Sequence, residues 1–513
     1  MPLAVQLLIF LRIRRVKCDE SQPHCQRCTG TGRTCDGYNK EPTPTSPIRG
    51  EIGGYSIVPF TGNVASAGDI QERHCFDFFC SETVPSIAGF FGSSAWNLVL
   101  QACSREPTVS QAVVALGALH ERSSISFQSS GVDGQRPIQT SFPLRQYSKA
   151  LGAFRQYLST AKDLDLNIIL TCALIHISIE VIQNNYTNAA VHLENSLQLL
   201  RQPSNHIQGA TPDHNNQRSR LETIEINSDL SRAFLRLDLQ ASMYLGMRAP
   251  AVAGKDTTYA VPARFSSISQ AKDVFDALTG QLYTLIRTVV EEYRYRKDEY
   301  IPLEAIAQVA HLKQALDLWD ERFEKYLGRL TSKFSRQEQL VINVLLVNHK
   351  VSTIEAATCT QPDASIFDRF DTKFDEIVTL AATVIWAHST TNSQVLKFSL
   401  DVGIIHPLYW TAIKCREPWI RQRAMSLLRS ITFQEGVWDA AVQASIAEVA
   451  IAREQIYGID GPAAGWRPPE FARVHSVGTN VLDPVRRVAQ VNLTQRLDGL
   501  DGPWTNYVEW ITW

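Results

Sequence analysis

The sequence predicts a mainly α-helical protein with a small cysteine-rich module at its N-terminus, a flexible linker, a large helical array and a small β element at its C-terminus. Four of the ten cysteines lie within residues 18–35. From about residue 70, apolar residues recur with the period of an amphipathic helix. The alternation typical of strands is confined to residues 472–513.

The N-terminal module combines closely spaced cysteines with a basic run. The cysteines follow the spacing C-x6-C-x2-C-x6-C and are Cys18, Cys25, Cys28 and Cys35. The basic residues that precede them are Arg12, Arg14, Arg15 and Lys17. Residues 1–40 contain seven Lys/Arg against three Asp/Glu, a net charge of +4, whereas the whole chain has a net charge of −2. This asymmetry is typical of a small DNA-binding module attached to a neutral body.

This segment resembles the last two-thirds of the fungal zinc binuclear cluster, in which six cysteines hold two zinc ions in the pattern C-x2-C-x6-C-x6-C-x2-C-x6-C. The resemblance implies that Cys18, Cys25, Cys28 and Cys35 bind zinc. The first two cysteines of the pattern would fall at Leu8 and Leu11, so two ligands are missing. Cys25 would bridge the two metals, and neither zinc would then have four ligands. Alternatively, the four cysteines gather around one zinc. Such modules are usually unfolded without metal. We therefore expect this module, which has only four of the six cysteines, to fold poorly.

Residues 1–11 have two alternative interpretations. Leu7–Arg12 can be encoded by pyrimidine-rich codons followed by AG, the sequence with which an intron ends, so we hypothesise that residues 1–11 are translated intron. The alternative is a signal peptide or membrane anchor. The apolar run is short, has no basic segment before it and lacks a small-residue cleavage site. It is also too short to span a bilayer.

The resemblance also implies how the module contacts double-stranded DNA. A short helix enters the major groove, and the residues before the third cysteine of the pattern read a CGG-type triplet. This assigns Arg14 and Arg15 to bases, and Arg12 and Lys17 to phosphates. Arginine suits guanine because two of its N–H groups match the O6 and N7 acceptors. The alternative is that the run is solvated, or is only a nuclear import signal. DNA binding implies the nucleus.

The remaining chain divides into a linker (41–69), a helical regulatory domain (70–460) and a C-terminal extension (461–513). The linker is rich in Pro, Gly and Thr and has no heptads, so no dimerising coiled coil is visible. Helices are predicted at about 71–80, 94–122, 145–160, 164–182, 186–201, 227–247, 268–298, 302–329, 335–358, 366–388, 404–416, 417–431 and 436–457. Strands are predicted within 472–482, 486–493 and 507–513.

The body resembles the regulatory domain that follows the zinc cluster in many ascomycete transcription factors. The matching runs are residues 76–121, 403–431 and 434–440. The resemblance implies a helical domain whose ligand and partners are undefined, and it implies no enzymatic activity. Nucleophile-elbow, Walker A, dinucleotide-binding and zinc-protease motifs are absent from the sequence.

Some residues of the body have both a functional and a structural interpretation. His406, Tyr409 and Trp410 either line a ligand pocket or belong to the core, and aromatic residues at helical spacing favour the core; Trp438 is likewise expected in the core. A group of arginines either binds an acidic partner or forms a solvated face, which we expect. They are Arg416, Arg421, Arg423 and Arg429.

The scattered cysteines indicate an intracellular protein, and the longest apolar stretch of the body indicates a core helix and not a membrane span. The six remaining cysteines are expected to be reduced, buried thiols. They are Cys75, Cys80, Cys103, Cys172, Cys359 and Cys415. Leu166–Ile179, the longest uncharged apolar stretch of the body, is expected to form a core helix because it is too short to cross a membrane.

The sequence therefore predicts a sequence-specific, zinc-dependent DNA-binding regulator of RNA polymerase II genes, such as a metabolic or secondary-metabolite gene cluster. Its expected partners are double-stranded DNA and the transcription machinery. The alternative is a helical interaction protein that descends from such a factor and no longer binds DNA. The sequence leaves open the target genes, the direction of regulation, any effector ligand and the oligomeric state.

Overall fold

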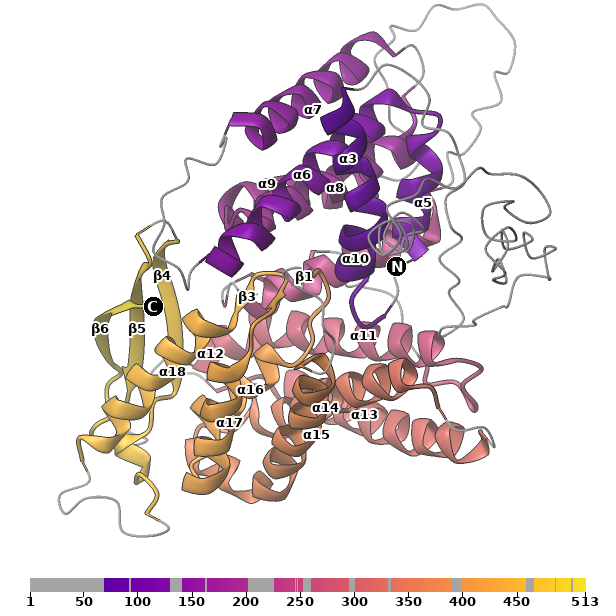
Figure 1. Cartoon of the computed structure of the whole chain (residues 1–513). Coiled ribbons are helices and arrows are strands. Elements are labelled where there is room, and N and C mark those ends of the chain that lie inside the picture. Colours follow the sequence, from indigo (N-terminus) through magenta and orange to yellow (C-terminus); the bar gives the residue numbers. More distant parts are fainter. Residues whose placement is uncertain are drawn as a thin grey trace, which may run out of the picture. The chain divides into compact units, whose positions relative to one another are not determined.

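The computed structural model describes residues 69–91, 94–129, 141–161, 164–201, 226–244, 246, 248–251, 260–294, 300–330, 334–389, 398–457, 466–484, 486–499 and 502–513. The predictions made for residues 1–68 lie outside these ranges. Within them the chain is mainly helical, as predicted, with short strands in its C-terminal third (Figure 1).

The helices of the first half are α3 (Ile70–Phe78), a π-helical turn η1 (Phe79–Thr83), α4 (Val84–Ile87), α5 (Ser94–Cys103), α6 (Pro107–Ser129), α7 (Ser141–Thr160), α8 (Leu166–Ile182), α9 (Tyr186–Arg201) and α10 (Ser228–Tyr244). The middle of the chain forms α11 (Ile268–Leu285), a second π-helical turn η2 (Ile286–Val290), α12 (Glu291–Arg294), α13 (Leu303–Arg329) and α14 (Arg336–Thr358). The remaining helices are η3 (Ala364–Phe370), α15 (Asp371–Ser389), α16 (Ile405–Lys414), α17 (Pro418–Ser430), α18 (Ala440–Gln455) and η4 (Glu470–Ala472).

The first core cluster is built around α6 and α8. Every residue of α8 from Leu170 to Ile182 is buried, which confirms the prediction of a core helix. A helix that is apolar on all sides must be covered all round, and α8 packs against α6 and α9. Its N-terminus is fixed by Asp165, whose carboxylate accepts a hydrogen bond from the Asn167 amide at 2.8 Å.

The second core cluster joins α11, α13 and α14 around Trp319. This side chain is fully buried, donates its Nε1–H to the Ala271 carbonyl at 2.8 Å and stacks on Phe323 and His349. Among the described helices, α14 alone is long and apolar enough to cross a membrane, and 61% of its most apolar window is buried inside the fold. That burial is typical of a core helix.

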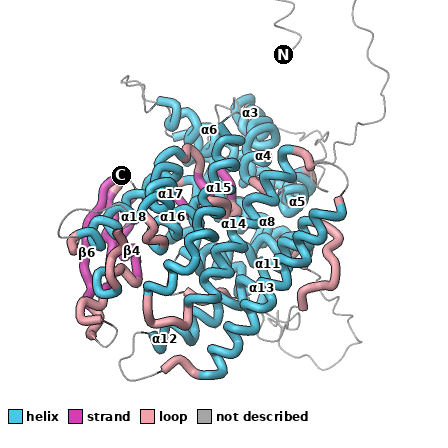
Figure 2. The backbone as a smooth tube through the Cα atoms, turned by 90° about the horizontal axis from the view of Figure 1, so that it is seen from below, coloured by secondary structure: helices cyan, strands magenta, loops and turns pink. Residues whose placement is uncertain are grey.

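The third core cluster joins α14–α18 to the C-terminal strands β4 (Ser476–Asp483), β5 (Val488–Gln495) and β6 (Thr505–Thr512). These strands form an antiparallel sheet in the order β4-β5-β6. Alternate residues of β5 are buried, as expected for a sheet with one face on a core. Figures 1 and 2 both show this sheet beside α18, and the predicted β element is therefore confirmed.

The observed boundaries differ from the predicted ones where turns interrupt a helical period. The helix predicted at 94–122 is two helices, because Pro107 starts a new one. The helix predicted from 436 begins at Ala440, after a hairpin of β2 (Gln434–Glu435) and β3 (Trp438–Asp439). A third short strand, β1 (Phe398–Ser399), pairs with β2 in parallel. Two-residue strands have no alternation to detect, so the sequence did not predict this sheet.

Candidate functional site

The residues predicted to bind zinc and DNA are not placed by the structure. Cys18, Cys25, Cys28 and Cys35, with Arg12, Arg14, Arg15 and Lys17, lie outside the described residues. Within the described part of the chain, no group of three or more His, Cys, Asp or Glu side chains is arranged to hold a metal ion.

The six cysteines of the body are free thiols, as predicted. Five are buried and Cys80 is half-buried. Burial raises the pKa of each thiol, for example to about 11 for Cys75 and to about 12 for Cys415. These side chains are protonated at neutral pH and act as apolar core residues.

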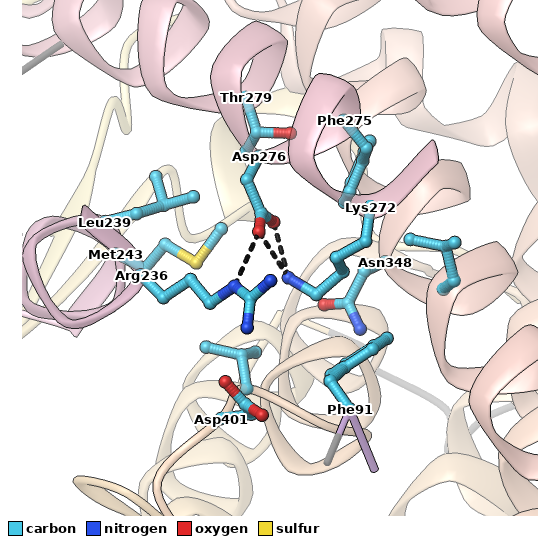
Figure 3. A pocket seen from close by; sticks show the side chains of 12 residues that line it. Phe91, Arg236, Leu239, Met243, Lys272, Phe275, Asp276, Thr279, Asn348 and Asp401 are labelled. Carbon is cyan, nitrogen blue, oxygen red and sulfur yellow. Dashed lines mark hydrogen bonds and ion pairs between the residues drawn. The ribbon is translucent and has the colours of Figure 1, made fainter. Parts of the chain in front are cut away.

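A small charged pocket lies where α10, α11 and α14 meet. Arg236 Nε and Lys272 Nζ both contact the Asp276 carboxylate, at 3.1 and 2.6 Å, and Arg236 Nη2 also binds Asp273 at 3.1 Å. Figure 3 shows Arg236 and Lys272 converging on Asp276, with Asp401 beyond the guanidinium. Burial raises the pKa of Asp401. Both cations of this pocket are therefore paired with carboxylates.

The volume of this pocket excludes a ligand of metabolite size. It has room for about 30 Å³ of solvent, enough for roughly two water molecules, whereas small-molecule sites measure hundreds of Å³. The ion pairs are partly buried and already satisfy one another. These ion pairs therefore join α10 to α11. The pocket contains no unpaired cation that could bind an anion.

Polar side chains of α11 and α14 also contact each other next to this pocket. Thr279 Oγ1 lies 3.4 Å from Ser352 Oγ, and the Tyr283 hydroxyl donates to Glu355 Oε1 at 2.8 Å. Burial raises the pKa of Glu355 to about 7. Facing positions of two core helices are thus polar where apolar residues would be expected.

Three aromatic side chains, from α10 and α16, surround Trp438. The ring centroids of Tyr244, His406 and Tyr409 lie 5.1, 4.8 and 6.2 Å from that of Trp438. Trp438 and His406 are buried, as the core interpretation predicted, and Tyr409 is half-buried. Burial, with the nearby charge of Arg287, lowers the pKa of His406 to about 3, so its imidazole is neutral at physiological pH.

Trp410 does not belong to this group. It packs against Phe367 and Phe374, with centroid separations of 5.7 and 5.6 Å, and is a core residue. Successive residues of a helix point in different directions, which is why Tyr409 and Trp410 have different neighbours.

A buried carboxylate positions His406 beside Trp438. Glu435 of β2 accepts hydrogen bonds from the backbone N–H groups of Gly403, Ile404 and Ile405 at 3.1, 2.9 and 2.8 Å. These groups lie at and just before the N-terminus of α16, where backbone N–H groups have no partner within the helix. Burial raises the pKa of Glu435 to about 7, and the three N–H groups oppose that effect. The hairpin that carries Trp438 is thereby fixed to the helix that carries His406.

The prediction that the four arginines form a solvated face is wrong for two of them. Arg416 and Arg421 are buried and bind the two oxygens of Glu454, each at 2.7 Å. Sequence analysis missed Glu454 because α18, which carries it, contacts α16 and α17 only in the folded chain.

The other two arginines remain partly or largely exposed. Arg423 pairs with Asp375, and Arg429 Nη2 lies 2.6 Å from Glu448. The four side chains therefore do not form one basic patch for an acidic partner.

Comparisons with known proteins match both parts of the chain. The profile of the fungal specific transcription factor domain matches residues 74–360, more than half of the chain, and that of the fungal Zn(2)-Cys(6) binuclear cluster domain matches residues 12–45. The chain is 23% identical to the aspercryptin biosynthesis cluster-specific transcription regulator atnN of Emericella nidulans, over 91% of this chain and 90% of that protein. It is 32% identical to the transcription regulator lscL of Purpureocillium lilacinum, over 38% of this chain and 49% of that protein. No solved structure matches it.

Proposed function

Because the chain belongs to the family of fungal transcription factors that carry this helical domain, we propose that it is a sequence-specific DNA-binding regulator of RNA polymerase II genes. We further propose that its targets are the genes of a secondary-metabolite cluster. The family is one of transcription factors and not of enzymes, and it implies the nucleus as the place of action.

One observation carries the proposal: a zinc-cluster match and a regulatory-domain match occur in one chain, in that order. The relative from Emericella nidulans aligns over 91% of the chain and is named for the regulation of a biosynthetic cluster. We propose the corresponding division of this chain into a zinc module (1–40), a linker (41–69), a regulatory domain (70–460) and a C-terminal extension (461–513).

The zinc-cluster family binds zinc and DNA, and the proposal assigns these roles to particular residues of this chain. Cys18, Cys25, Cys28 and Cys35 supply four thiolates, which suit one tetrahedral zinc but cannot complete two. Bound zinc would fold the module and hold the basic run in place. In the proposal Arg14 and Arg15 contact bases, and Arg12 and Lys17 contact phosphates.

Leu8 and Leu11 occupy the positions of the two absent cysteines, and the zinc-cluster match begins after them, at residue 12. This is consistent with the hypothesis that residues 1–11 are translated intron. Sequencing the full-length transcript tests it. A first exon that encodes a C-x2-C pair is expected, and a transcript that continues from Met1 through Leu11 without a junction would contradict the hypothesis.

A gel-shift titration tests DNA binding by the full chain. Duplexes that contain CGG triplets are expected to bind more tightly than scrambled duplexes, and chelation should abolish the difference. In the chain restored with Leu8→Cys and Leu11→Cys, Arg15→Ala should cost about 1–3 kcal/mol on CGG duplexes alone, whereas Lys17→Ala should weaken binding to all sequences alike. Equal binding to both duplexes, unchanged by chelator, would contradict the proposal.

The incomplete cysteine pattern favours one alternative function. A chain that cannot close a zinc cluster would act as a helical interaction protein that titrates partners of related factors. In that case the helical body would bind a partner protein, and neither the CGG duplex nor the scrambled duplex would be shifted in the gel.

A further inference from the structure

Strand β6 forms one edge of the C-terminal sheet, and its outer side is unpaired among the described residues. It is the last strand in the order β4-β5-β6, and no other backbone hydrogen bond of the described chain reaches residues 505–512. Figure 1 shows β6 as the outer strand of this sheet. Alternate N–H and C=O groups of β6 therefore point away from β5 and can bind another strand.

Strand β6 lacks the features that usually prevent an edge strand from pairing. Such features include bulges, proline, lysine and short length. Strand β4, at the other edge, has an irregularity of register between Thr479 and Val481. In contrast, β6 pairs with β5 over all eight residues without a shift, and its sequence TNYVEWIT has a single charged residue, Glu509, and no proline or lysine. The edge is therefore regular and suited to continue the sheet.

The solvent face of β6 is apolar at its centre. Val508 is 54% exposed and Trp510 is 60% exposed. Because side chains of a strand alternate between the two faces, both point away from the face that carries the buried Ile511. An exposed apolar pair beside an open, regular edge is typical of a strand that pairs with another chain.

Two opposite charges on the other face of β6 have no ionic partner in the part of the chain that the structure describes. Arg453 of α18 lies over the Tyr507 ring, with its Cζ 3.4 Å from the ring centroid, and donates its Nε–H to Gln495 Oε1 at 3.0 Å. Glu509, two residues from Tyr507 and on the same face, is exposed. A strand that supplies a cation near Glu509 and a carboxylate near Tyr507 would match both charges.

We propose that β6 pairs in antiparallel orientation with β6 of a second copy of this chain, so that two C-terminal sheets join into one. Antiparallel pairing of a strand with its own copy is isologous: a two-fold axis relates the copies, and each contact occurs twice. Residues directly opposite each other point to the same face of the joined sheet. The same residue of the two copies must therefore meet at the axis.

Charge selects the residue at the axis. Within β6, an axis at Val508 pairs residues 505–511 and an axis at Glu509 pairs residues 506–512, whereas every other position pairs fewer residues. Glu509 at the axis would place two carboxylates directly opposite each other, which is destabilising. Val508 at the axis places Glu509 opposite Tyr507 of the second copy. The proposed dimer therefore has Val508 at its centre.

This register gives each unpartnered group a partner. Glu509 of one copy lies beside Arg453 of the other, because Arg453 covers the ring of Tyr507, and this contact occurs twice. On the solvent face the two Val508 side chains meet, and Trp510 lies diagonally next to Val508 of the second copy, within reach of its side chain. A second copy thus matches the hydrogen-bonding edge, the apolar pair and the charges together.

The inference goes beyond the proposed function, because it concerns association of the helical body and requires neither zinc nor DNA. One pair of strands with two apolar residues from each copy is at the low end of specific interfaces. We therefore expect a reversible dimer with a dissociation constant on the order of 10 µM.

Sedimentation equilibrium of the full chain, without DNA and with chelator, tests the proposal. The average mass should rise from that of one chain toward that of two between roughly 1 and 100 µM. Val508→Lys places two ammonium groups opposite each other at the axis and should weaken the dimer at least about tenfold. Val191→Lys in α9 is the matched control, because Val191 is also 54% exposed, and it should leave the dimer unchanged.

A mixing experiment tests the contact between Glu509 and Arg453. Glu509→Arg brings two cations together at each contact and Arg453→Glu brings two anions together, so each variant alone should dimerise more weakly than wild type. An equimolar mixture should recover the dimer. In it, Glu509 of one variant meets Arg453 of the other, and the two replaced side chains also have opposite charges. A contact within one chain cannot produce this recovery.

Three results would overturn the proposal. The first is a full chain that stays monomeric up to roughly 100 µM, ten times the expected dissociation constant, in which case the edge does not bind a second copy. The second is a dimer that Val508→Lys leaves unchanged, which would place the contact elsewhere. The third is a mixture of the two charge variants that dimerises no better than either alone. If Arg453→Glu does not fold, Val508→Lys with its control remains the test. All these measurements omit DNA, so their failure is distinguishable from a failure of the proposed function.

Discussion

Arg416 Nη2 lies 2.7 Å from Glu454 Oε1, and both side chains are almost completely inaccessible to solvent. The second oxygen of Glu454 binds Arg421, also at 2.7 Å, and Oε1 additionally accepts the backbone N–H of Val474 at 2.8 Å. One carboxylate therefore joins the connection between α16 and α17 to the segment that leads into the C-terminal sheet. A buried charge is tolerated only when it is paired and hydrogen-bonded, so this junction depends on Glu454.

Removal of the Glu454 charge should destabilise the helical body strongly. Glu454→Gln leaves two buried guanidinium groups without a counter-charge, and we expect a loss of about 3–5 kcal/mol in the free energy of unfolding. Urea denaturation followed by circular dichroism measures it. The matched control is Glu448→Gln, which removes the partner of Arg429 in an exposed pair and should change stability by less than about 1 kcal/mol. Equal effects of the two substitutions would show that Glu454 is not the critical carboxylate.

The same group predicts an acid-dependent loss of stability. Burial acts to raise the pKa of Glu454, but the charges of Arg416 and Arg421 outweigh it and lower the pKa to about 2, from an ordinary value of 4.5. Between these values the unfolded chain binds the proton and the folded chain does not, so stability falls as the pH falls. The difference in the free energy of unfolding between wild type and Glu454→Gln should therefore have its full value above about pH 4.5 and decrease toward pH 2. A difference that stays constant over that range would contradict the assignment.

The turn that carries Trp438 depends on a glycine. Gly436 has a φ of +53°, and a Cβ there would lie 2.3 Å from Gln240 Nε2. Gly436→Ala should destabilise the protein by about 1–3 kcal/mol, because it adds strain and displaces the Gln240 amide. Gly152→Ala in α7 is the matched control, since a Cβ there meets nothing within 4 Å, and it should raise stability by about 0.5–1 kcal/mol. Thermal melts of the two variants should shift in opposite directions.

The elements that could be predicted from sequence are those whose signal is local. Every position of Leu166–Ile179 is uncharged, so α8 could be predicted as a core helix from its composition alone. Strands β4–β6 were predicted because alternation over eight residues is visible in the sequence.

The features that sequence analysis missed depend on contacts between distant residues. The burial of Arg416 depends on a glutamate 38 residues away. The aromatic group around Trp438 combines residues from α10, α16 and β3, and no spacing in the sequence relates Tyr244 to Trp438. Sequence analysis identified the N-terminal cysteines because zinc ligands recur at fixed short spacing; their geometry lies outside the described residues.

Metal should be confined to the N-terminal module. Residues 1–40 have four cysteines, so elemental analysis of the purified full chain should give fewer than two zinc ions per molecule. Chelation should leave the helical circular dichroism almost unchanged, because no group in the described residues is arranged to hold a metal. Two tightly bound zinc ions, or loss of most helical signal on chelation, would contradict this division of the chain.

If this chain derives its function from a zinc-dependent DNA-binding module, restoration of the two absent zinc ligands should produce specific DNA binding. Leu8→Cys with Leu11→Cys supplies the second bridging thiolate and completes both zinc sites in the pattern that the family implies. Fluorescence anisotropy of the restored chain with labelled duplexes is the measurement. We predict zinc-dependent binding that favours CGG duplexes over scrambled ones by at least about tenfold and is lost on chelation. Equal affinity of the restored chain for both duplexes would contradict it.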